Sequence, residues 1–217
     1  MAVTLIERAR QVIATQDDDF FEAETILYYL NKAQRKVVSY CMQKEKADPR
    51  LSLRALDDLR VVGDSGALTA TAKGSYFQAD ITFPAGLLDF QHLRYENRTI
   101  LRELNSQKLY MLEWGNLVPT IYEGYFQVTK VSSAKKFRVF LHEDPDVDAR
   151  VHIFYVKEPT EITLTSTALT ELPEQLENAV IYGAAMMMTA QESVKDPNPT
   201  GQGIATIYQE ELQASVY

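Results

Sequence analysis

The sequence has a single cysteine among its 217 residues, so an internal disulfide is excluded. A lone Cys41 agrees with a reducing compartment. Long apolar runs are also missing, because residues 179–190 fall short of the ~20 residues that a membrane-spanning helix needs. Near the start, Glu7, Arg8 and Arg10 interrupt the apolar segment that a signal peptide would require. We therefore expect a chain that is made and kept in the cytoplasm, without a membrane anchor.

Basic residues are in deficit, with 22 Lys and Arg against 30 Asp and Glu and a net charge of −8. This balance argues against a general nucleic-acid binder, which would display a basic face. The charges are unevenly spread: residues 32–60 hold eight basic and four acidic side chains, whereas residues 171–217 hold one and seven. Such a division indicates complementary surfaces on neighbouring copies or partners. Solvated helix faces would explain the same pattern.

Catalytic and metal-binding motifs are scarce as well. The sequence GDSG around Ser65 matches the nucleophile segment of a serine protease, but no histidine precedes it. The alternating aspartates of residues 144–148 begin like a calcium loop, but Ala149 and Tyr155 stand where that loop needs Gly and Glu. We interpret both segments as turns. No phosphate-binding loop, CxxC pair or HExxH is present, so we expect no enzyme, no catalytic residue, no cofactor and no metal site.

Helical periodicity marks both ends of the chain. A capping box at Thr4 and Glu7 predicts a short first helix. Apolar residues at spacings of three and four between Ile26 and Cys41 predict a second helix of about six turns. Near the other end, residues 172–192 (LPEQLENAVIYGAAMMMTAQE) predict a third helix, and a last one begins at about Thr200.

The centre of the chain changes to a period of two, which is typical of strands. The segments are ALTATA, YFQADITF, LLDFQHLRYE, TILREL, PTIYEGYFQV, KFRVFLHE and ARVHIFYVKEP, with a helical turn at SQKLYMLEWG. We therefore predict an α+β fold in which N- and C-terminal helices pack together and an antiparallel β domain is inserted. The expected boundaries are 1–66 with 160–217 for the helical, ring-forming domain and 67–159 for the β insertion.

The alanines, the glycine and the three methionines of residues 172–192 suggest close helix packing, because small residues let backbones approach and methionines fill irregular gaps. We expect this helix to pack on the second helix, across the insertion. The alternative is a methionine surface that binds a partner.

Four segments in this order resemble the head-to-tail adaptor (connector) proteins of tailed bacteriophages, including the tail tubular protein A type. They are the helix ILYYLNKAQRKVVSY, the hairpin FRVFLHEDPDVDARVHIFYVKEP, the linker TEITLTSTALTELPE and the helix LPEQLENAVIYGAAMMM with a shorter one after it. The resemblance implies a structural virion protein of the neck, assembled in the host cytoplasm. It would form a dodecameric ring that docks on the capsid portal, joins it to a tail protein and lines part of the DNA channel.

The resemblance also implies contact residues. The portal-contact candidates are Tyr208, Leu212, Val216 and Tyr217. Packing of Tyr208 and Leu212 on the preceding helix is the alternative. The subunit-contact candidates come from the charge pattern and are Lys32, Arg35, Lys36, Glu174 and Glu177. Two other functions stay open: another neck or tail-completion ring component that binds tail proteins, and a ligand-binding module with its site in the β insertion.

Overall fold

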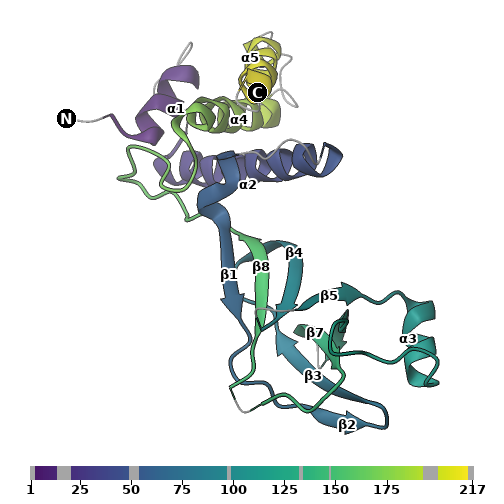
Figure 1. Cartoon of the computed structure of the whole chain (residues 1–217). Helices are drawn as coiled ribbons and strands as arrows, with labels where there is room; N and C mark the ends of the chain where they lie inside the picture. Colours follow the sequence, from purple (N-terminus) through teal and green to yellow (C-terminus); the bar gives the residue numbers. More distant parts are fainter. Residues whose placement is uncertain are drawn as a thin grey trace. The chain divides into compact units, whose positions relative to one another are not determined.

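The computed structural model describes residues 3–13, 21–48, 54–96, 99–131, 134–146, 148–192 and 200–214. The chain divides into two compact units (Figure 1). We call Met1–Leu59 with Glu158–Tyr217 the helical unit and Arg60–Lys157 the β unit. A helical part with a β part inserted into its sequence confirms the predicted α+β class. No helix in the described part of the chain is long and apolar enough to cross a membrane.

The helical unit contains α1 (Leu5–Ile13), α2 (Ala23–Ala47), the 3-10 helix η1 (Arg54–Leu59), α4 (Glu174–Glu192) and α5 (Thr200–Ala214). The predicted capping box opens α1: Thr4 N donates to the Glu7 carboxylate at 2.7 Å, and Glu7 N donates to Thr4 Oγ1 at 3.2 Å. The hydrogen bond from the Thr4 backbone lowers the pKa of Glu7. Glu22 is the N-cap of α2, and its side chain makes no capping hydrogen bond.

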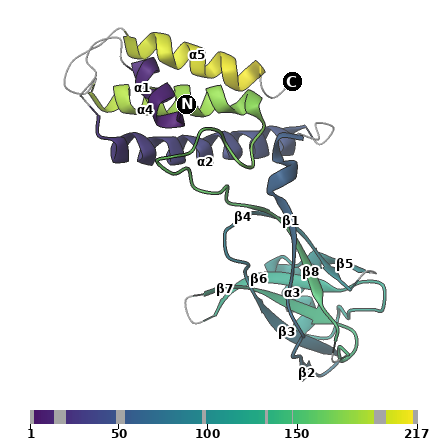
Figure 2. The same ribbon diagram turned by 90° about the vertical axis from the view of Figure 1, so that its left-hand side faces the viewer.

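Helix α4 is the centre of the helical unit. It lies between α2 and α5, which form layers on its two sides (Figure 2). A Cβ placed on Gly183 would lie 2.9 Å from the Tyr208 ring of α5 and 3.4 Å from the Ala33 Cβ of α2. The predicted packing of this helix on α2 is therefore confirmed. Met188 is fully buried, so the methionine run contributes to the core of the chain.

The β unit is one eight-stranded sheet in the order β1-β8-β4-β5-β6-β7-β3-β2. The strands are β1 (Arg60–Asp64), β2 (Thr71–Lys73), β3 (Tyr76–Thr82), β4 (Leu87–Tyr95), β5 (Thr99–Glu103), β6 (Tyr125–Val131), β7 (Ala134–Leu141) and β8 (Val151–Lys157). Neighbouring strands run antiparallel except β5 and β6, which pair in parallel. Strand β8 carries apolar residues on both of its faces, which predicts a strand inside the sheet. It lies between β1 and β4.

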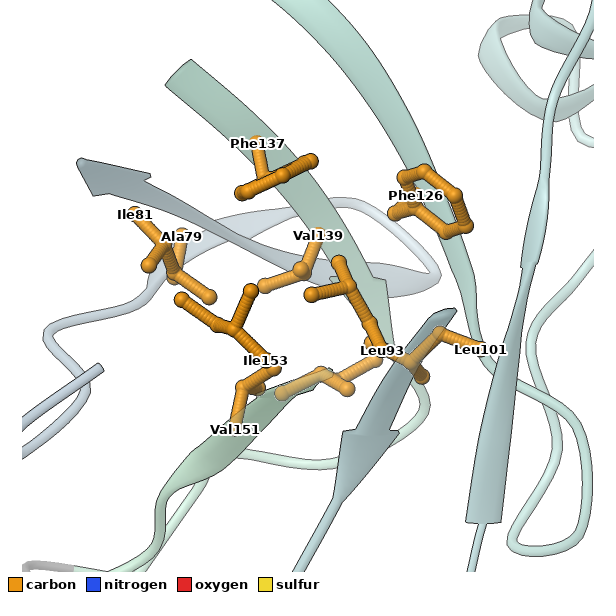
Figure 3. Packing of buried hydrophobic residues seen from close by; sticks show 10 residues of the cluster. Ala79, Ile81, Leu93, Leu101, Phe126, Phe137, Val139, Val151 and Ile153 are labelled. Carbon is orange, nitrogen blue, oxygen red and sulfur yellow. The ribbon is translucent and has the colours of Figure 1, made fainter. Parts of the chain in front are cut away.

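The sheet curls around its main core. Ala79 and Ile81 of β3 join one buried cluster with Val151 and Ile153 of β8, although four strands separate β3 from β8 in the sheet order (Figure 3). In a flat sheet, neighbouring strands lie ~4.8 Å apart, so two strands with four others between them would be too far apart to share a cluster. The sheet must therefore be strongly curved. A second cluster forms on the other face, where Leu112 of α3 (Ser106–Glu113) packs with residues of β3, β6 and β7.

Strand β1 is the main difference from the predicted elements. The segment between α2 and the predicted strands forms η1 and then β1. Since β1 pairs with β8 from Arg60↔Val156 to Asp64↔His152, the β unit begins at Arg60, against an expected boundary after residue 66. The strand expected over residues 119–128 begins at Tyr125, after a turn closed by a Thr120↔Glu123 bridge.

Candidate interaction surfaces

The basic side chains of α2 lie along an open groove of about 690 Å³ in the helical unit. Because successive turns of a helix place residues three and four apart on one face, Lys32, Arg35 and Lys36 are brought together with the exposed Tyr28. The lining residues are Glu24, Leu27, Tyr28, Asn31, Lys32, Arg35, Lys36, Ser39 and Glu161. The three predicted basic contact residues therefore share one surface.

Asn31 fixes the second wall of this groove. Its Oδ1 accepts from Ile162 N at 2.8 Å, and its Nδ2 donates to Ile162 O at 3.1 Å, so one amide side chain holds the linker that follows the β unit. Next to it, Arg35 pairs with Glu161 of the same linker at 3.2 Å. The sequence pattern did not identify Asn31, because the residue it binds lies 131 positions away.

Two tyrosine rings contact the Lys32 side chain at the basic end of the groove. The ammonium of Lys32 lies 5.7 Å from the centre of the Tyr28 ring and 5.8 Å from that of Tyr29. Such cation–π contacts hold a flexible lysine side chain in one direction. Tyr29 is buried, whereas Tyr28 is 61% exposed and presents its ring to solvent.

The two acidic contact candidates have different surroundings. Glu174 is exposed at the start of α4. Glu177 is only 6% exposed; it pairs with Arg8 of α1, and its carboxylate also accepts from Leu169 N at 3.3 Å. A contact between Glu177 and a neighbouring copy would have to displace Arg8. Neither residue lines the groove, so the structure does not bring them next to the basic candidates.

The portal-contact candidates lie in the last helix and beyond it. Tyr208 and Leu212 are 7% and 3% exposed and belong to the face of α5 that packs inside the helical unit. Burial is the largest cause of the raised pKa of Tyr208. Val216 and Tyr217 lie outside the described residues. The packing that was the alternative for Tyr208 and Leu212 is present, and a portal contact stays a prediction.

A group of exposed apolar residues on α3 and just after it was not predicted from the sequence. Leu112 of α3 is buried, but Tyr110, Met111, Trp114 and Val118 are 59%, 39%, 68% and 39% exposed. The Tyr110 and Trp114 rings lie 5.4 Å apart, and Leu117 N donates to Met111 O, which holds the chain after α3 against the helix. We call Tyr110, Met111, Trp114 and Val118 the aromatic patch. Aromatic residues and Met are enriched at protein interfaces.

The polar segments that could have carried chemistry either form turn hydrogen bonds or line a hollow too small for a ligand. Ser65 Oγ accepts from Val151 N at 3.0 Å, and Asp64 accepts from Gly66 N at 2.7 Å, so GDSG ends β1 in an Asx turn. His142 and Glu143 line a hollow of about 30 Å³, too small for a ligand. Among the described residues, no group of three His, Cys, Asp or Glu is placed to hold a metal ion.

Comparison with known protein families gives a match to one family model. The SU10 adaptor protein family matches residues 2–216, which is nearly the whole chain. No individually curated protein matches the chain. The match includes both the helical unit and the inserted β unit, so it does not rest on one of them alone. The chain therefore belongs to the SU10 adaptor protein family, a family of phage head-to-tail adaptors.

Proposed function

We propose that this chain forms the ring that docks on the capsid portal in the neck of the virion and joins it to the tail. The observation that carries the proposal is the family match over residues 2–216. The protein is structural, assembles in the host cytoplasm as a homo-oligomer of twelve copies, and is of the tail tubular protein A type. It has no catalytic role and uses no cofactor.

The charge of the chain supports a channel through which DNA passes. A protein that binds DNA neutralises phosphates with Lys and Arg and releases counterions. A net charge of −8 has the opposite effect, since excess carboxylates repel phosphate. Repulsion suits a wall along which DNA must move without being retained. A ring of twelve copies multiplies this charge around the channel.

Two surfaces support contacts with other virion proteins. Val216 and Tyr217 are proposed to bind the portal, and the buried Tyr208 and Leu212 anchor the preceding helix α5 within the helical unit. The aromatic patch is proposed to bind a tail protein. Trp and Tyr are enriched among the residues that contribute most to binding at protein interfaces.

The test is the mass of the purified protein, alone and mixed with the portal protein from the same genome, by native mass spectrometry or light scattering. The expected result is a ring of defined stoichiometry on the portal. Truncation before Val216 should weaken this complex, whereas Lys73→Glu in the β unit, an exposed charge change, should not. A protein that stays unbound to the portal overturns the proposal.

A second candidate is another neck or tail-completion ring component. The aromatic patch fits this function as well as the first, because a tail protein would bind there in either case. The same mass measurement separates the two functions. Binding to a tail protein without binding to the portal would assign the chain to the second. A ligand-binding module has less support, because the hollow in the β unit at His142 measures about 30 Å³.

A further inference from the structure

The helical unit presents two outward faces on opposite sides of α4. On α2, the residues that face α4, such as Ala33 and Val37, are fully buried, and the groove residues lie on the opposite side of the helix. On α5, the buried residues are Ile204, Tyr208 and Leu212, one turn apart. Since α4 lies between these two helices, the outward faces of α2 and α5 point away from each other (Figure 2).

Acidic, apolar and basic side chains follow one another along the outward face of α2. Glu24 comes first, the apolar wall of Leu27 and Tyr28 follows, and the basic group of Lys32, Arg35 and Lys36 comes last. Tyr28 and Lys32 are one turn apart, about 6 Å along the axis. A helix that fits this groove needs an apolar side chain followed by a carboxylate at a similar distance.

The outward face of α5 has that order. Ile207 is 38% exposed, and Glu210 follows it on the same face at a distance of about 4.5 Å along the axis. The remaining exposed positions, such as Thr206 and Gln213, are small or uncharged. Residues 200–214 include no Lys or Arg. The charge of this face is therefore opposite to that of the basic group on α2.

We propose that the outward face of α5 lies in the α2 groove of a neighbouring copy, with the two helices parallel. Ile207 then packs on Tyr28, and Glu210 pairs with Lys32 and Arg35. The parallel direction also places the positive N-terminal end of α5 near Glu24, whereas an antiparallel helix would bring Glu210 towards Glu24. This inference rests on the proposed ring and names the surfaces that build it.

The contact joins two different surfaces, so an open row of joined copies has one free α2 groove at one end and one free α5 face at the other. Such a heterologous contact repeats from copy to copy and closes into a ring when the rotation is right. Within the isolated chain Arg35 pairs with Glu161, but both side chains are about half exposed or more, at 48% and 74%. Exposed pairs contribute little to stability. Arg35 can therefore exchange this partner for Glu210.

A cysteine crosslink tests the geometry directly. Tyr28→Cys and Ile207→Cys are placed together in one chain, where both positions are exposed and Cys41 is buried. Oxidation of the full-length protein, alone and on the portal, is expected to give a ladder of covalent multimers. Each single variant should stop at a dimer or a monomer. A ring on the portal in which the double variant gives no ladder overturns the inference.

Charge reversal tests the electrostatic part. Lys32→Glu with Arg35→Glu, or Glu210→Lys alone, should weaken association by about tenfold at low salt, because the two exposed ion pairs with Glu210 are lost. A mixture of the two variants should associate like the wild type, since each reversed α2 meets a reversed α5. Lys73→Glu with Lys130→Glu, exposed in the β unit, is the control with the same charge change.

The outcomes separate this inference from the proposed function. A wild-type ring on the portal together with unaffected charge variants overturns the α2–α5 contact and leaves the adaptor function intact. Weakened variants that the mixture does not restore also overturn it, because the loss would then come from altered folding. A wild-type protein that forms no ring on the portal overturns both.

Discussion

Gly183 is the point where α4 contacts both of its neighbours, and its replacement by alanine tests how tightly the helical unit is packed. The added Cβ would lie 2.9 and 3.3 Å from two carbons of the Tyr208 ring and 3.4 Å from the Ala33 Cβ. The closest of these contacts is too short for real side chains, so α5 must shift. The Tyr208 ring is 7% exposed and is surrounded by other side chains, which limits its own movement.

Two effects of the Gly183→Ala substitution oppose each other. Alanine in a helix interior is favoured over glycine by about 1 kcal/mol. An additional carbon in a close-packed core costs about 1–3 kcal/mol. Because the contact is made with a ring on a neighbouring helix, we expect the packing cost to win. The free energy of unfolding of the helical unit should fall by up to about 2 kcal/mol.

The assay is urea unfolding followed by far-ultraviolet circular dichroism, which reports mainly the helical unit because α3 is the short helix of the β unit. The control is Tyr208→Leu, which removes the ring. In that background Gly183→Ala should become neutral or stabilising by up to about 1 kcal/mol. An alanine that stabilises the protein with Tyr208 present would refute the reasoning, since it would mean that the helices separate freely at this point.

Three further predictions concern buried or paired groups. Arg8→Met leaves the carboxylate of Glu177 buried without its partner and should lower the free energy of unfolding by about 1–3 kcal/mol; adding Glu177→Gln should recover part of this loss in the same urea assay. Two hydrogen bonds from Arg138, at 2.8 and 3.0 Å, hold the pKa of Asp80 below its usual value. The stabilisation is therefore present above about pH 4 and is lost as the pH falls through the lowered pKa, so Asp80→Asn should cost about 1 kcal/mol at neutral pH and nothing in strong acid. Burial raises the pKa of the Cys41 thiol to about 11, so a thiol reagent should react with the folded protein at least about tenfold more slowly than with the protein in urea; equal rates would show that this part of α2 opens readily.

The sequence predicted those elements whose signals are local. The capping box at Thr4 and Glu7 forms its hydrogen bonds within four residues, and α2 follows directly from the apolar spacing between Ile26 and Cys41. The packing of α4 on α2 was also predictable, because alanines and a glycine at helical spacing favour close contact between backbones. On the candidate surface, i and i+4 spacing alone was enough to place Lys32 and Lys36 on one face.

The remaining features depend on partners far away in the sequence. Strand β1 is a strand because it pairs with β8, and its five residues include Gly63, which weakens a local strand signal. Asn31 forms a groove wall only because the linker at Ile162 returns to it. Glu177 was expected at a contact between copies, but Arg8 comes close enough to pair with it inside the chain. Periodicity does not reveal such long-range contacts.

The two proposed contact surfaces differ in physical kind, and this difference has a consequence for assembly. The α2–α5 contact depends in part on exposed charges, which salt screens over about 8–10 Å at physiological ionic strength. The aromatic patch depends on the burial of Trp and Tyr side chains, which salt does not weaken. Raising the salt concentration should therefore weaken the association of the copies with one another more than the binding of each copy to its tail protein.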